Sequence, residues 1–237
     1  MIIRNIFILF LLGITTAFAQ TSKTGEFIIT STPAEILGQD AAQYNDYIAT
    51  DDNISWEIYV PENYDASNPA GVMVYAGAPN DVRPPVGWLS AMKDSNLIWV
   101  AARRSGNGSS IHQKKLLAML SVPMIQKEYN IDDSRIYISG EGRTASRTAL
   151  EYPEMFNGAI LLGGKLWEDN ADEKLKKALK NRYVFVTRER HIVPQGNRYA
   201  YNKFKAAGVE NIQLHFLRGR QRFDRRDLLN SIEYLDQ

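Results

Sequence analysis

The sequence predicts an α/β domain built on a doubly wound, mostly parallel sheet that is flanked by helices. Short apolar runs of strand length, such as residues 71–77 and 97–102, recur along the chain and indicate strands covered on both faces. Stretches with helical spacing separate these runs. Strands that alternate with helices in this way favour parallel pairing through crossover connections.

The chain begins with a segment that is typical of export signals. Arg4 supplies a positive start, residues 6–14 form an apolar core, and Ala17-Phe18-Ala19 is a small-x-small cleavage site before Gln20. We therefore expect residues 1–19 to be a removed signal peptide and the protein to be exported, either periplasmic or extracellular, without stable membrane association after cleavage. A retained anchor is the alternative, but the apolar run is short for a span of about 20 residues.

Residues 20–53 form an N-terminal extension that is polar and weakly patterned, and its one short apolar run, residues 27–29, is the only candidate for an edge strand. The main domain is expected over residues 54–237. Residues 54–60 alternate between apolar and polar side chains, as a half-buried strand should, and Pro61 ends that strand. Further strands are expected at 71–77, 97–102, 136–139, 158–162, 183–187 and 213–217.

Helices are expected between these strands. The longest covers residues 111–129, where Pro123 predicts a kink. The others are expected at residues 86–95, 143–152, 172–180, 197–207 and 226–235. The helix over 172–180 is highly charged, which is typical of a solvated face.

Composition excludes several classes of function. The 28 basic residues nearly balance the 27 acidic ones, so no overall charge attracts the chain to nucleic acid or to an anionic membrane. The absence of cysteine excludes disulfides, thiolate catalysis and cysteine metal sites. No H-E-x-x-H, phosphate-loop or G-x-G-x-x-G motif is present, so we expect neither a metal nor a cofactor.

One stretch carries the strongest functional signal. Residues 135–144 have the pattern of a buried strand, a tight glycine turn and the start of a helix. This stretch resembles the nucleophile elbow of α/β-hydrolases, in which G-x-S-x-G holds a serine above the sheet. Residues 56–64, 129–140 and 152–158 are similar to secreted esterases related to polyhydroxybutyrate depolymerases and feruloyl esterases, and the likeness covers roughly Ile54 to Asp236.

The resemblance also implies where a catalytic triad would stand, and the chain has other residues there. The nucleophile position falls on Gly142, the acid position on Arg190 or His191, and the histidine position on Arg222. The resemblance further places Gly77 where a loop donates a backbone N–H to the oxyanion hole. We therefore expect an esterase-like protein that is catalytically inactive.

A carboxylic-ester or acyl hydrolase with a non-standard site is the alternative. Its constellation would use Ser139 or Ser146 together with Glu189 and His191. The predicted elements disfavour this, because Ser139 should lie within a strand and Ser146 one turn into a helix. His112, His191 and His215 are expected to be surface or packing residues.

Arginines replace the catalytic groups at the ends of the predicted strands. Ligands of open α/β sheets bind beyond the carboxyl ends of the strands, and guanidinium groups suit carboxylate or phosphate. We predict a site for an acidic small molecule, saccharide or peptide, formed by Gly77, Arg103, Arg143, Arg190, Arg220 and Arg222. The alternatives are arginines that pair with Glu141, Glu189, Asp224 and Asp227 and bind nothing, or an interaction domain with a closed cleft.

Overall fold

The computed structural model describes residues 23–77, 82–106, 108–140, 143–163, 172–188, 196–218 and 221–237. Their strands form an eight-stranded sheet in the order β1-β2-β4-β3-β5-β6-β7-β8. β1 and β2 pair antiparallel to each other and β2 pairs antiparallel to β4, whereas all the other neighbours are parallel. The strands are β1 Gly25–Ser31, β2 Ile54–Val60, β3 Ala70–Tyr75, β4 Leu97–Ala102, β5 Ile131–Gly140, β6 Gly158–Leu161, β7 Arg182–Arg188 and β8 Ile212–Leu217.

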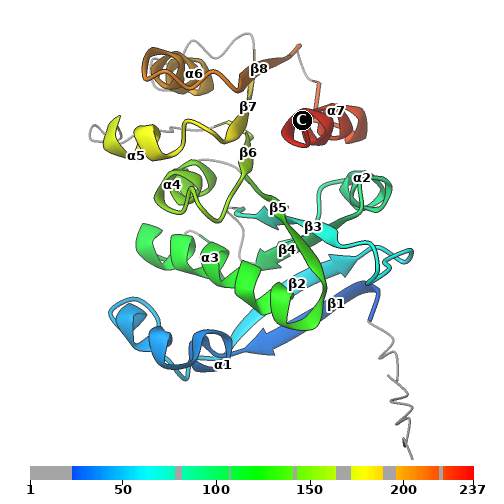
Figure 1. The fold of residues 1–237 in the computed structure, drawn as a ribbon, viewed down its shortest axis with the longest axis vertical. Coiled ribbons are helices and arrows are strands. Elements are labelled where there is room, and N and C mark those ends of the chain that lie inside the picture. The colour runs from blue at the N-terminus through cyan, green and yellow to red at the C-terminus, as the bar shows by residue number, and fades with distance from the viewer. Residues whose placement is uncertain are drawn as a thin grey trace, which may run out of the picture.

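Helices cover both faces of this sheet, which gives three layers (Figure 1). In Figure 1, α1, α3, α4, α5 and α6 lie on one side of the sheet, and α2 and α7 lie on the other. The helices are α1 Pro33–Leu37, η1 Gly38–Tyr44 (a 3₁₀ helix), α2 Trp88–Asp94, α3 Ile111–Glu128, α4 Arg143–Glu151, α5 Asp172–Lys177, α6 Asn197–Ala206 and α7 Arg225–Leu235. No helix among the described residues is long and apolar enough to cross a membrane.

The sheet separates two hydrophobic cores, and alternate residues of one strand enter different cores. Val72 and Val74 of β3 belong to the core beneath α3 and α4, whereas Met73 belongs to the core beneath α2 and α7. Trp88 and Trp99 are almost completely buried in the second core. Burial on both faces explains why these strands appear in the sequence as continuous apolar runs.

The predicted doubly wound, mostly parallel sheet is confirmed, and the strands and helices after residue 53 lie within a few residues of their expected places. α3 runs from Ile111 to Glu128 with Pro123 inside it, and the kink expected at Pro123 stays a prediction. The extension before residue 54 holds more structure than its weak pattern indicated: β1, α1 and η1 all precede β2. Thr32 and Glu35 start α1 with a reciprocal capping box, and β1 occupies one edge of the sheet.

The carboxylate of Glu151 connects three helices on the face of the sheet that α3 covers. Glu151 at the end of α4 accepts hydrogen bonds from Lys115 of α3 at 2.6 Å and from Lys174 of α5 at 3.1 Å. Burial alone would raise the pKa of Glu151, but these two ammonium groups outweigh it and lower that pKa. The Lys115 side chain is only 8% exposed, so its ion pair with Glu151 is shielded from solvent on the lysine side.

Candidate functional site

The turn that resembles a nucleophile elbow lies at the centre of the sheet. β5 ends at Gly140 and α4 begins at Arg143, so two residues connect strand to helix. A Cβ on Gly140 would lie 2.2 Å from the carbonyl oxygen of Ala76, and Gly140 has φ +156. The backbone N–H of Ala76 donates to the carbonyl of Ser139 at 2.7 Å. The first glycine of the motif is therefore required by backbone-to-backbone packing. Gly142 itself lies outside the described residues.

The space beside this turn is small. Gly77 follows β3 and lines a cavity of about 10 Å³ together with Ala76, Ser105, Lys114 and Thr144. A cavity of that size holds one water molecule at most. This one cavity is therefore too small to hold an acyl group.

The two serines of the alternative active site are buried. Ser139 is 0% exposed and its hydroxyl donates to the carbonyl of Ile160 at 3.0 Å. Ser146 is 1% exposed and donates to the carbonyl of Arg143 at 3.2 Å. A nucleophilic serine needs access to substrate and a base on its hydroxyl, and these two hydroxyls are used by the backbone instead. Glu189 and His191 lie outside the described residues.

The two described histidines are positioned by packing. His112, in the first turn of α3, stacks on Tyr47 with ring centroids 5.0 Å apart. His215 lies in β8, and its Nε2 is 3.3 Å from Oδ1 of Asp227 on α7. That contact suits an ion pair but is not aligned as a hydrogen bond. As predicted, His112 opens a helix and His215 lies within the last strand.

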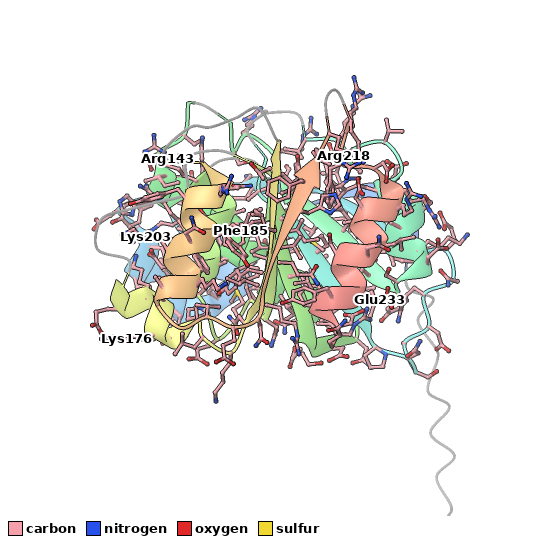
Figure 2. All side chains as sticks on the ribbon, turned by 90° about the horizontal axis from the view of Figure 1, so that it is seen from above. Arg143, Lys176, Phe185, Lys203, Arg218 and Glu233 are labelled. Atoms are coloured by element: carbon pink, nitrogen blue, oxygen red, sulfur yellow. The ribbon has the colours of Figure 1, made fainter. Side chains whose placement is uncertain are left out.

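Arg222, which we predicted at the histidine position of a triad, lies in the connection from β8 to α7. Arg222 is exposed there, as are Arg218 at the end of β8 and Arg143 at the start of α4. Figure 2 shows Arg143 and Arg218 toward the end of the sheet where β8 finishes, on opposite sides of that strand in this view. Arg190 and Arg220 lie outside the described residues.

Two acids that could have neutralised these arginines have another role. Asp224 is the N-cap of α7 and accepts the backbone N–H groups of Arg226 and Asp227. Asp227 accepts the backbone N–H of Asp224 in return, at 3.2 Å. Among the described residues, neither Arg143 nor Arg222 forms an ion pair. The described acids Asp224 and Asp227 therefore do not pair with these two arginines.

Arg103 lies apart from the other predicted ligand residues. Its Nε is 3.5 Å from Oε1 of Glu57, and it lines a pocket with Arg104. Residues of α4 and of the segment before α7 are not among those lining that pocket. Arg104 has φ +55, a left-handed conformation that costs a residue with a Cβ about 1–2 kcal/mol. Nothing in the sequence pattern indicated Arg104's conformation or its pocket.

Within the described parts of the chain, no group of three or more metal-ligating side chains could hold a metal ion. No family model and no curated protein matches the sequence. The fold, by contrast, is similar to that of many solved structures.

Several of these structures are esterases. A thermostable esterase superposes with a TM-score of 0.59 at 18% identity, over 90% of this chain and 60% of its own. A ferulic acid esterase gives a TM-score of 0.60 at 11% identity, over 90% of this chain and 99% of its own. An acetyl xylan esterase from Aspergillus awamori gives 0.56 at 13% identity, over 76% of this chain and 94% of its own. The chain thus has the α/β-hydrolase fold, with esterases among its structural neighbours.

Proposed function

We propose that this protein is an exported α/β-hydrolase-fold protein that does not hydrolyse esters and instead binds an acidic ligand at the carboxyl end of its sheet. This proposal rests mainly on the burial and hydrogen bonding of the two serines near the elbow. Ser139 and Ser146 are buried and hydrogen-bonded to backbone carbonyls, and the nucleophile position holds Gly142.

The energetic consequence of a missing triad is large. Loss of the nucleophile or of the base lowers kcat by about 10⁶ in a serine hydrolase, because the triad residues act as a unit. A surviving oxyanion hole would still accelerate hydrolysis roughly 10³-fold over water. Weak ester hydrolysis would therefore not by itself indicate an enzyme.

The first experiment measures hydrolysis of p-nitrophenyl acetate and butyrate by the protein without residues 1–19, with and without a serine-directed phosphonate. We expect no rate that the phosphonate abolishes. Gly142→Ser should restore none, because Arg222 stands where the base would be. A phosphonate-sensitive rate that His191→Ala also removes would reveal a relocated active site and overturn the proposal.

The second experiment tests the acidic ligand. Arg143 and Arg222 are exposed, and neither pairs with Asp224 or Asp227, the two described acids of the salt-bridge alternative. Titration with triglutamate should show saturable binding, and triglutamine should show none. Arg143→Ala and Arg222→Ala should each weaken triglutamate binding about tenfold, since a hydrogen bond to a charged group contributes about 1.5–3 kcal/mol.

Lys177→Ala is the matched control for that titration. It removes one exposed positive charge next to Lys176, which Figure 2 places toward the opposite end of the sheet. The affinity of Lys177→Ala for triglutamate should equal that of the unmodified protein. Equal losses in all three variants would mean that only overall charge matters and that no arginine site exists.

A further inference from the structure

A second pocket lies beside the hydrolase-like site. It has a volume of about 520 Å³ and is formed by the loop before β2 and the corner between β4 and α3. Small-molecule sites typically have volumes of about 300–1,000 Å³. We call it the corner pocket, and its polar lining comprises Asp52, Asn53, Ser55, Arg103, Arg104 and Gln113.

Two hydrogen bonds, one within the backbone and one from backbone to side chain, fix the walls of the corner pocket. The N–H of Arg103 donates to the carbonyl of Ser55 at 2.9 Å, which joins the start of β2 to the end of β4. The N–H of Ala49 donates to Oδ2 of Asp52 at 3.1 Å, which closes the loop before β2. Ile48, another lining residue, is 4% exposed and anchors this loop in the core. The pocket is thus bounded on both sides by ordered structure.

Arg104 stands in a conformation that suits glycine better than arginine. Its φ is +55, and the hydroxyl of Ser109 donates to its carbonyl at 3.0 Å. Asn96 is the other described non-glycine residue with positive φ, and asparagine tolerates that region more readily. Strained backbone of this kind clusters at functional sites. Here the left-handed residue is an arginine that lines the pocket.

The charges of the corner pocket point to a carboxylate. Arg103 is already near Glu57, at 3.5 Å, whereas Arg104 is exposed and forms no ion pair with a described residue. α3 begins here with Ser110 as its N-cap and has no acidic residue in its first turn, so the positive end of the helix is not neutralised. Arg104 is therefore the group best placed to receive an anion.

The remaining polar groups suit hydroxyls. Asp52 accepts hydrogen bonds, while the amides of Asn53 and Gln113 both donate and accept, which is the mixture that a polyol requires. A simple anion would use Arg104 but would not contact these polar groups.

We propose that the corner pocket binds a sugar acid of the hexuronate type, with the carboxylate on Arg104 and the hydroxyls on Asp52, Asn53 and Gln113. This site is separate from the exposed arginines Arg143 and Arg222. The proposal for the corner pocket does not depend on whether the protein hydrolyses esters at the elbow.

The test is a calorimetric titration of the protein with glucuronate, glucose and acetate. Glucuronate should bind saturably and more tightly than either of the others. Arg104→Gln should weaken glucuronate binding at least tenfold, whereas Lys177→Ala should leave it unchanged. Loss of binding in Arg143→Ala and Arg222→Ala but not in Arg104→Gln would move the ligand to the elbow and overturn this proposal. Equal affinity for glucose or for acetate would overturn it as well.

A second variant separates function from folding. Arg104→Gly should relieve the left-handed strain and raise Tm by about 2–4 °C, while it abolishes glucuronate binding. A variant that is both more stable and unable to bind would show that the arginine is present for the ligand. Unchanged binding by Arg104→Gly would refute the assignment.

Discussion

Replacing Gly140 by alanine tests the geometry of the elbow directly. The new Cβ would lie 2.2 Å from the oxygen and 2.8 Å from the carbon of the Ala76 carbonyl. Both distances are about 1 Å inside ordinary contact. Overpacking costs about 1–3 kcal/mol where side chains can move, and here the obstacle is backbone held by a 2.7 Å hydrogen bond between Ala76 and Ser139. We therefore expect Gly140→Ala to lower the free energy of unfolding by about 3 kcal/mol or more.

Urea unfolding followed by tryptophan fluorescence measures this loss. With an m-value of about 3 kcal/mol per M, the midpoint should fall by about 1 M or more. Gly208→Ala is the control, because Gly208 has φ +88 but nothing within 4 Å of an added Cβ. It should cost only the left-handed penalty of about 1–2 kcal/mol. If the two variants unfold at the same urea concentration, the close approach of β3 and β5 does not explain why residue 140 is glycine.

Two further predictions concern the α7 cap and the buried tyrosines. Asp227→Ala removes the capping-box carboxylate that receives the N–H of Asp224 and faces His215, so the free energy of unfolding should fall by about 1–2 kcal/mol. Glu233→Ala, exposed on the same helix, should stay within about 0.5 kcal/mol in the same urea assay, and equal losses would contradict the capping role. Burial raises the pKa of Tyr129 and Tyr152 to about 12, so ionisation opposes folding. The free energy of unfolding should be fully retained below about pH 10 and decline as pH rises toward 12. Urea midpoints at about pH 9 and 11 check this decline, which Tyr152→Phe should make shallower, and a stability that rises over this interval would refute it.

Much of the fold could be predicted because its signals are local. Residues 97–102 form a strand with the expected bounds, since a strand covered on both faces must be apolar throughout. The start of α4 at Arg143 followed from the glycine turn before it. The start of α1 was missed although it carries a readable signal, the capping box Thr32-x-x-Glu35 with Pro33 at the first helical position.

The candidate site was less predictable because it depends on contacts between distant segments. The sequence could predict that the arginines follow strand ends. It could not predict that Arg103 lines a different pocket, because that pocket also needs a loop some fifty residues earlier in the chain. Asp224 and Asp227 were considered as arginine partners, whereas the helix start uses them as caps. The burial of Ser146 likewise follows from the tertiary packing of α4.

The position of β1 has a consequence for the corner pocket. β1 pairs only with β2, at the edge of the sheet, and the loop that forms one pocket wall lies between these two strands in the chain. Edge elements open by local unfolding at a lower free-energy cost than central strands, so this wall is exposed to partial opening that leaves the parallel sheet intact. Ligand binding in the corner pocket should therefore increase the protection of β1 amides from hydrogen exchange, because a bound ligand would also hold β1 in place.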